Sequence, residues 1–457
     1  MKINRIVFIL GFIITLFGCA ESEIQIANEE VAEPEEENEA QEQDPVHPNI
    51  LLIIADDMSL DAVPNYADEL GAKKPIMPTL EKLMNTGLVF DNLWSYALCS
   101  PTRASILTGK HGLHTDVLEP IRDMLSGDHI SLQSYINNNT GDAYATGVFG
   151  KWHLGADATH PTKTMDVGTY SGSIGGGVPD YWSYKLVENE VSRSLTSSND
   201  MERAENYSTT KYTQLAMDWK QQQTKPWFIW LAYNAAHTPF HRPDDRLISS
   251  ESIARSESNT NNYLAMLEAM DFEMGRFIDA MTEAEKANTL IVFIGDNGTP
   301  KKVAQFTDID KHSKGSIYQG GINVPLVVAG LNVRVGRESD VLVHTVDLYA
   351  TIAEFAGVDS KSIYNSFSFK DVLEDVNAQG KEFIYTEVPK EESNGFFAVR
   401  NSSYKLIFEI DTGAKELYNL KDDKYESNDL TLGVMSETDV VNLALLMAEG
   451  ERLRAEE

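Results

Sequence analysis

The stretch Ile50-Leu51-Leu52-Ile53-Ile54-Ala55-Asp56-Asp57 decides the fold. Six consecutive apolar residues are typical of a central parallel strand that helices cover on both faces. Three similar runs follow, with helical patterns between the four runs. We expect strands at 50–55, 227–233, 290–294 and 324–329, and helices at 78–86, 207–223 and 262–281. The alternation predicts an α/β fold with a large, mostly parallel sheet sandwiched by helices.

Polar residues gather where these strands end. Asp56 and Asp57 follow the first run directly. Asp296 and Asn297 follow the third run, and His237 lies four residues beyond the second. Because ligands of such sheets bind at the carboxyl ends of the strands, we expect the functional site at this edge.

The last quarter of the chain has a different pattern. Short apolar segments separated by turn residues lie at 383–388, 396–400, 404–410 and 416–420, and a helical pattern covers 436–456. This predicts a smaller C-terminal antiparallel sheet plus helix. We place the catalytic domain at 48–375 and the C-terminal subdomain at 376–457. Residues 168–200, rich in serine and glycine, are expected to form long surface loops that contact substrate.

The composition excludes several classes of protein. The 457 residues suffice for one large α/β domain and a smaller one. Lys and Arg number 38 against 70 Asp and Glu, for a net charge of −32, which argues against any nucleic-acid partner. Two cysteines rule out a disulfide scaffold and a cysteine-rich metal site. An anionic substrate must therefore be held by a local cluster of cations.

The N-terminus reads as a targeting segment. Residues 1–18 have the pattern of a secretory signal peptide, with Lys2 and Arg5 ahead of a short apolar run. The ending at Cys19 resembles a bacterial lipobox, which implies cleavage before this residue and lipid attachment to its thiol. Residues 19–47 are then an acidic, disordered tether, because 20–47 carry many Glu residues and no Lys or Arg. We expect an exported protein that its lipid anchors to a bacterial membrane, the outer membrane being favoured, on its periplasmic or surface face.

The segment that begins Cys99-Ser100-Pro101-Thr102-Arg103 carries the chemistry. Pro101 suits the first turn of a helix, so Cys99 would lie at or just before a helix N-terminus, where negative charge is favoured. On these grounds Cys99 is a candidate activated nucleophile. The alternative is a buried structural cysteine.

This pattern, Cys-x-Pro-x-Arg followed by Leu-Thr-Gly, resembles the signature of the formylglycine-dependent sulfatases. These are arylsulfatase-like members of the alkaline phosphatase superfamily. Further motifs match in the family's order: Asp56-Asp57, Gly150-Lys151-Trp152-His153-Leu154-Gly155, Ala236-His237-Thr238-Pro239, Gly295-Asp296-Asn297-Gly298 and Lys314-Gly315. The resemblance runs from Asn49 to about Leu430 and implies an alkaline phosphatase-like fold.

The resemblance also implies an activity, the hydrolysis of sulfate esters. In this family a maturation enzyme oxidises the motif cysteine, here Cys99, to formylglycine, whose hydrate attacks sulfur with one hydroxyl and releases sulfate through the other. Arg103 would support this nucleophile, and His153 would assist the release step. Lys151 and Lys314 would bind sulfate oxygens, while His237 would bind substrate and protonate the leaving alkoxide.

A divalent cation is the second implied component. Asp56, Asp57, Asp296 and Asn297 match the family's metal ligands, and residue 99 would complete the shell. Their hard oxygen donors suit Ca²⁺, with Mg²⁺ as the alternative. Three further residues stay open between lining the site and simple packing: Trp152, His241 and His312.

The sequence departs from the family's pattern at two positions. The family usually has Glu where Gln319 stands and Arg where Asn323 stands. Because an acid and a base are both replaced by amides, we interpret them as a structural ion pair exchanged for a neutral one. A substrate role carried over for either residue is therefore in doubt.

Export and family together favour a sulfated carbohydrate as substrate. Algal polysaccharides such as ulvan, carrageenan or fucoidan are candidates. One alternative is a phosphonate monoester or phosphodiester hydrolase of the same superfamily. Another is a non-catalytic carbohydrate-binding lipoprotein, although such a protein would be expected to have lost some of the motif residues. Nothing in the sequence demands more than a monomer.

Overall fold

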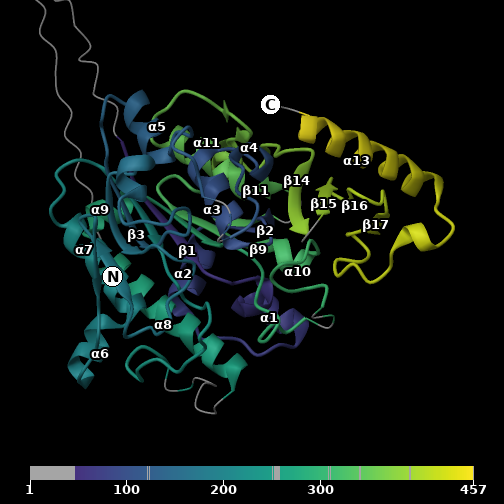
Figure 1. The fold of residues 1–457 in the computed structure, drawn as a ribbon. Coiled ribbons are helices and arrows are strands. Elements are labelled where there is room, and N and C mark those ends of the chain that lie inside the picture. Colours follow the sequence, from purple (N-terminus) through teal and green to yellow (C-terminus); the bar gives the residue numbers. More distant parts are fainter. Residues whose placement is uncertain are drawn as a thin grey trace, which may run out of the picture. The chain divides into compact units, whose positions relative to one another are not determined.

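The computed structural model is built around one wide β-sheet (Figure 1). The structure describes residues 47–455, apart from 121, 123, 250, 252–257, 307, 309, 339–340 and 391–392. The expected signal peptide, Cys19 and the acidic segment as far as residue 46 lie outside the described residues. Every helix in the described part is too short or too polar to span a membrane.

The main sheet is mixed but mostly parallel, and its central strands are the predicted apolar runs. Its path runs β10-β2-β9-β8-β1-β7-β3-β4-β5-β6, and β11 also pairs with β2. The strands are β1 (Asn49–Ala55), β2 (Leu88–Trp94), β3 (Ala145–Lys151), β4 (Thr169–Ser173), β5 (Lys185–Glu188), β6 (Val191–Ser194), β7 (Trp227–Ala232), β8 (Thr289–Gly295), β9 (Asn323–Gly330), β10 (Gly336–Glu338) and β11 (Val343–His344).

Strand β1 lies at the centre, parallel to both β7 and β8. All of its residues are buried, which explains its unbroken apolar run. The fourth run is different, because β9 pairs antiparallel with β8 and with β2. The expectation that 324–329 is a parallel strand is therefore wrong. A parallel return needs a crossover connection, usually a helix, whereas among the described residues that link β8 to β9 the one α-helix is the four-residue α10 (Gln319–Ile322).

Helices cover both faces of the sheet, as predicted. Alternate residues of β1 point into two separate cores: Ile50, Leu52 and Ile54 into one, Leu51 and Ile53 into the other. The first core is closed by α3 (Cys99–Thr108), α5 (Leu132–Asn139) and α11 (Leu348–Phe355), the second by α2 (Pro78–Thr86), α7 (Ser208–Lys220) and α8 (Asn259–Asp279). Shorter helices are α1 (Pro64–Leu70), α4 (Gly112–Thr115), α6 (Asp200–Asn206), α9 (Glu283–Ala287) and α12 (Lys370–Glu374).

Residues 168–200 are not simply long surface loops, as the sequence suggested, because they contain β4, β5 and β6. β4 extends the sheet parallel to β3, and β5 and β6 continue it as antiparallel strands. The backbones of β3 and β4 come very close: a Cβ at Gly172 would lie 1.9 Å from the carbonyl oxygen of Gly150. Small residues allow this contact but leave no apolar pattern to reveal the strand.

The predicted C-terminal antiparallel sheet is present, with a helix along one face (Figure 1). Its strands are β14 (Ile384–Lys390), β15 (Ser393–Arg400), β16 (Tyr404–Glu409) and β17 (Lys415–Asn419), followed by α13 (Glu437–Ala455). One face packs on α13 through Leu446. The other face packs on the main sheet, where Trp94 and Ile322 meet Ile407 and Tyr418. This small sheet therefore supports the edge of the main sheet at which the strands end.

Candidate active site

The motif residues converge at the carboxyl edge of the main sheet. Asp56 and Asp57 follow β1, Asp296 follows β8, and Cys99 begins α3. One potential ligand atom from each of these four residues lies within 4.8 Å of the other three, and all four are buried. Segments that are up to 240 residues apart in the sequence thus form one polar cluster.

Helix α3 begins at Cys99 for local reasons. Leu98, the residue before it, is extended, and Pro101 lies in the first turn, where its missing N–H costs no helical hydrogen bond. The helix ends at Gly109, which has φ = 68°. Arg103, one turn after Cys99, lies on the same side of the helix. The sequence therefore positions the thiol and the guanidinium together.

Two fully buried ion pairs and one partly buried pair neutralise the cluster. Arg103 donates through Nε and Nη2 to Asp296 Oδ2, at 3.1 and 2.8 Å, and both side chains are fully buried. Lys151 Nζ lies 2.9 and 2.7 Å from the two carboxylate oxygens of Asp56, again with both side chains fully buried. Lys314 Nζ lies 2.5 Å from Asp57 Oδ1. Each carboxylate thus has one cation, as buried charges require.

Burial and the neighbouring cations shift the pKa values of Asp56 and Asp57 in opposite directions. Burial raises the pKa of Asp56 to about 6, although Lys151 lowers it. Burial also acts to raise the pKa of Asp57, but Lys314, His237 and Lys151 together lower it to about 2.

The thiol of Cys99 is not activated. Its Sγ accepts a hydrogen bond from Lys314 Nζ at 3.3 Å. Burial nevertheless raises the pKa of the thiol to about 11, although Lys151 and Lys314 lower it. Desolvation thus outweighs the nearby cations and favours the protonated thiol over a thiolate in the unmodified residue.

The cluster has the donors that a hard divalent cation requires. Three carboxylates face one another, and carboxylate and amide oxygens are the ligands that Ca²⁺ and Mg²⁺ prefer. Asn297 Nδ2 donates to Asp57 Oδ1 at 2.7 Å. Its other amide atom, Oδ1, is buried and has no hydrogen-bond partner within the described chain. A buried acceptor without a partner is costly, and a cation ligated by Asn297 Oδ1 would remove that cost.

Two histidines lie beside the cluster. His237 Nδ1 is 2.9 Å from the carbonyl oxygen of Thr238, which can only accept, so Nδ1 carries a proton. His237 Nε2 lies 4.0 Å from Asp57 Oδ2, and the ring is partly exposed. Burial, with Lys151 and Arg103 nearby, lowers the pKa of His153 to about 2, so its imidazole is neutral. His237 therefore turns Nε2 toward the cluster, while the backbone holds its Nδ1.

A run of glycines lies against both rings, within the segment 168–200 that was expected to contact substrate. A Cβ at Gly176 would lie 2.3 Å from His153 Cε1, and one at Gly177 would lie 2.9 Å from His237 Cε1 and Nδ1. The preceding Gly175 has no such neighbour. The run Gly175-Gly176-Gly177 in the sequence was the available signal.

The sequence left three residues open between lining the site and simple packing, and the structure shows all three packed against other residues. Trp152 is buried and donates to His160 at 3.1 Å. His241 packs among aromatic rings, 4.3 Å from that of Tyr181. His312 is buried and accepts from the backbone N–H of Gly320 at 3.2 Å.

The two positions that depart from the family's pattern do not pair with each other. Gln319 Oε1 accepts from Trp94 Nε1 at 2.8 Å. Asn323 Nδ2 donates to the carbonyl oxygen of Asp91 at 3.0 Å. The interpretation that they form a direct neutral pair is wrong for the described structure, in which each amide bonds a different residue.

Comparisons with known proteins agree with this geometry. Residues 48–358 match the family described as Sulfatase, and residues 309–448 match the family described as N-sulphoglucosamine sulphohydrolase, C-terminal. Arylsulfatase J of Mus musculus is 30% identical over 328 residues, which cover 68% of this chain and 52% of that protein. The chain thus spans about half the length of this relative.

Solved structures have the same fold. The crystal structure of Ps i-CgsB in complex with k-i-k-neocarrahexaose superposes with a TM-score of 0.75, at 24% identity, over 90% of this chain and 93% of that one. The structure of BT4656 in complex with its substrate D-glucosamine-2-N,6-O-disulfate gives a TM-score of 0.71, at 20% identity, over 90% and 99%. Since the family match covers more than half of the chain and the motif residues converge, this protein belongs to the sulfatase family, whose members hydrolyse sulfate esters.

Proposed function

We propose that this protein hydrolyses sulfate esters on carbohydrate and that Cys99 is the residue converted to formylglycine. The observation that carries the proposal is the position of this cysteine. Its Sγ lies among three carboxylates and within 3.3 Å of Lys314 Nζ, yet burial keeps the thiol protonated. A protonated thiol is a poor nucleophile, so this location makes chemical sense if the residue is modified. Formylglycine, as its hydrate, supplies hydroxyl groups at this position.

The two lysines are the proposed sulfate ligands. Lys151 and Lys314 are paired with Asp56 and Asp57. Once those carboxylates serve as metal ligands, both ammonium groups become available to the sulfate oxygens. Because the chain has a net charge of −32, this local pair of cations offsets the repulsion that an anionic substrate meets.

Each remaining motif residue has a proposed task. His237 Nε2 protonates the leaving alkoxide, and Asp57, 4.0 Å away, stabilises the protonated ring. Neutral His153 lies beside the cluster and assists the release step as a hydrogen-bonding group. Arg103 holds Asp296 through two hydrogen bonds and donates a third to the carbonyl oxygen of Lys151 at 3.1 Å. It thereby fixes one metal ligand and the end of β3.

The proposed ligands of the cation are Asp56, Asp57, Asp296 and Asn297, together with residue 99. Ca²⁺ is favoured because the donors are all hard oxygens, and Mg²⁺ is the alternative. The bound ion supplies positive charge that stabilises the nucleophile and the developing charge on sulfate.

A sulfated carbohydrate is the proposed substrate class. The solved relatives include one in complex with neocarrahexaose and one in complex with a disulfated glucosamine. Algal polysaccharides such as ulvan, carrageenan and fucoidan remain the candidates. We also propose export as a lipoprotein anchored at Cys19, with 19–47 as tether, 48–375 as catalytic domain and 376–457 as C-terminal subdomain. Maturation by a formylglycine-generating enzyme would precede activity, and the chain would act as a monomer.

The experiment is a substrate screen. Protein with formylglycine verified at position 99 is incubated with sulfated polysaccharides and their oligosaccharides, and free sulfate is measured by ion chromatography. Release from at least one carbohydrate, absent in Cys99→Ala, supports the proposal. Failure with every carbohydrate, combined with turnover of a phosphonate monoester or a phosphodiester, would assign the chain to the alternative reaction.

A further inference from the structure

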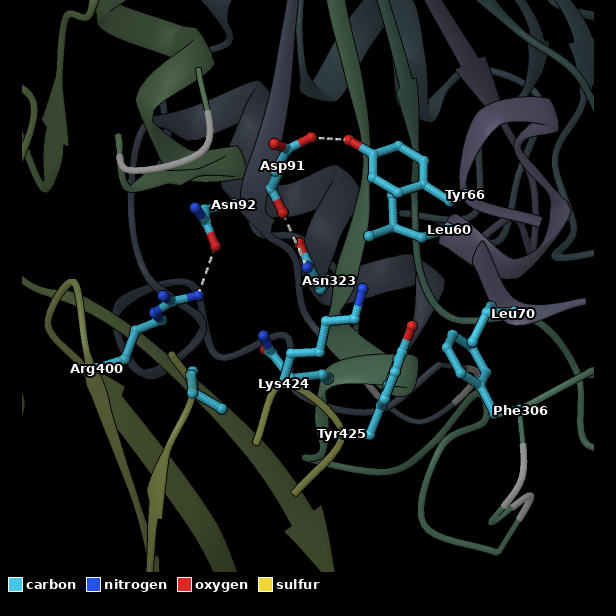
Figure 2. A pocket seen from close by; sticks show the side chains of 12 residues that line it. Leu60, Tyr66, Leu70, Asp91, Asn92, Phe306, Asn323, Arg400, Lys424 and Tyr425 are labelled. Atoms are coloured by element: carbon cyan, nitrogen blue, oxygen red, sulfur yellow. Dashed lines mark hydrogen bonds between the residues drawn. The ribbon is translucent and has the colours of Figure 1, made fainter. Parts of the chain in front are cut away.

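A cavity with a mixed polar and apolar wall lies between the first helices, the end of β2 and the C-terminal sheet (Figure 2). Its volume is about 300 Å³, and none of the proposed catalytic or metal-binding residues lines it. In Figure 2, side chains from four separate parts of the chain surround it, among them Tyr66, Asp91, Arg400 and Lys424. The proposed reaction gives this cavity no role.

Two amide side chains in the cavity wall each use only one of their two polar atoms in a hydrogen bond to a described residue. Asn323 is 7% exposed; its Nδ2 donates to Asp91, but its Oδ1 has no partner within the described chain. Gln319 is 9% exposed and uses Oε1 to accept from Trp94, while its Nε2 has no hydrogen bond to a described residue. Asn323 Oδ1 is enclosed by the protein, so Gln319 Nε2 is the amide group that the cavity presents, as a donor. A ligand that brings an acceptor oxygen, such as a hydroxyl-bearing molecule, would satisfy it.

Charged groups add further polar contacts. Arg400 is almost fully buried, and its Nη1 donates to Asn92 Oδ1 at 2.8 Å. The carboxylate of Asp91 accepts from the hydroxyl of Tyr66. Lys424 reaches across the front of the cavity in Figure 2. Cationic and anionic groups therefore both line the cavity, which favours a hydroxyl-rich ligand over a simple anion.

Aromatic rings supply the apolar part of the wall. Tyr66, Phe306 and Tyr425 all line the cavity, and the rings of Phe306 and Tyr425 are 6.3 Å apart. Aromatic faces suit a ligand that has an apolar face and polar edges. A pyranose ring has C–H groups on its faces and hydroxyls around its edge. The volume, at the lower end of the range of about 300–1,000 Å³ for ligand sites, limits the occupant to one ring.

The two departures from the family's pattern meet in this cavity. Gln319 and Asn323 stand where the family usually has Glu and Arg, and both line it. An asparagine is shorter than an arginine, so the exchange at 323 leaves space and removes a charge from the wall. We propose that this cavity binds one sugar residue of a carbohydrate chain, separately from the catalytic centre. Such a site would hold a polymer on the protein while the catalytic centre acts elsewhere on it.

Sugar binding by the full chain tests this proposal. The probes are D-galactose, D-glucuronate and N-acetyl-D-glucosamine, which carry no sulfate, with inorganic sulfate as the anion control. Binding is measured by saturation-transfer NMR and calorimetry. The decisive variant is Gln319→Glu/Asn323→Arg, which fills the cavity with the family's usual residues. Its matched control, Asn377→Arg/Gln379→Glu, places the same charges on an exposed segment.

We expect at least one sugar to bind the wild-type protein. The cavity-filled variant should bind that sugar at least tenfold more weakly, and the control variant should bind it with unchanged affinity. Hydrolysis of 4-nitrophenyl sulfate should be the same in all three proteins. Tyr425→Ala removes one aromatic wall and should also weaken binding, which keeps the test valid if the double variant does not fold. Absence of binding by every sugar, equal binding by the cavity-filled variant, or binding of glucuronate and sulfate but not of galactose would each overturn the proposal. None of these outcomes depends on whether the chain cleaves sulfate esters.

Discussion

The three consecutive glycines beside the catalytic histidines allow a graded perturbation. Gly176→Ala adds a single methyl group that would lie 2.3 Å from His153 Cε1, 2.4 Å from Nε2 and 2.8 Å from Nδ1. Ordinary contacts begin at 3.4 Å. The imidazole must therefore retreat by about 1 Å, and a displacement of that size costs on the order of 100-fold in rate. This corresponds to about 2.7 kcal/mol of transition-state stabilisation.

The neighbouring glycines provide the scale. A Cβ at Gly177 would lie 2.9 Å from the His237 ring, which requires about half that displacement, so we expect a loss of roughly tenfold. A Cβ at Gly175 has its nearest neighbour at 3.7 Å, so Gly175→Ala should behave as the wild type. All three variants carry the same added methyl in the same segment, but Gly176→Ala meets His153, Gly177→Ala meets His237 and Gly175→Ala meets neither.

The assay is kcat/KM for 4-nitrophenyl sulfate, with circular dichroism and thermal melting as controls for folding. The predicted order of activity is Gly175→Ala, then Gly177→Ala, then Gly176→Ala. The reasoning is refuted if folded Gly176→Ala retains the activity of Gly175→Ala. That result would mean that His153 either does not act or moves without consequence.

Three further predictions address the cation, the general acid and the buried Lys405–Glu426 ion pair of the C-terminal subdomain. Removing metal with EDTA should abolish activity and added Ca²⁺ should restore it; full activity in protein shown to be metal-free by elemental analysis would contradict the metal site. His237→Ala should slow the release of sugar alkoxides more than that of 4-nitrophenolate, because only the poor leaving group needs a proton; equal losses in kcat/KM would argue against this role. Lys405→Met should destabilise the fold by about 3–5 kcal/mol in denaturant unfolding, because it leaves the fully buried Glu426 carboxylate without its cation; a loss below about 1 kcal/mol would contradict that account.

The parts of the fold with strong apolar patterns could be predicted from the sequence. β1, β7 and β8 are fully buried runs, and their hydrophobicity shows directly in the sequence. β4 could not be found in this way, because Thr-Tyr-Ser-Gly-Ser contributes only Tyr170 to the hydrophobic core and its other residues are small or polar. The direction of β9 was also missed, since an apolar run carries no information on which neighbour it pairs with.

The candidate site, like the fold, could be predicted only in part from the sequence. The motif order indicated which residues would meet, and the structure brings Asp56, Asp57, Cys99 and Asp296 together. The pKa of the Cys99 thiol could not be predicted. The position of the residue at a helix N-terminus suggested a lowered pKa, but the sequence does not reveal the burial that raises it. The segment 168–200 was expected to contact substrate, but the contacts of Gly176 with His153 and of Gly177 with His237 could not be predicted, because a glycine shows its role only through what lies beside it.

The central claim is that position 99, once modified, performs sulfate ester hydrolysis. The most direct measurement compares wild-type protein, with formylglycine at position 99 verified by peptide mass, with Cys99→Ala at equal concentration. Both are assayed for sulfate released from 4-nitrophenyl sulfate and from the best carbohydrate of the screen. We predict release by the modified wild type in proportion to its formylglycine content and none by the folded variant. Comparable release by Cys99→Ala would contradict the account.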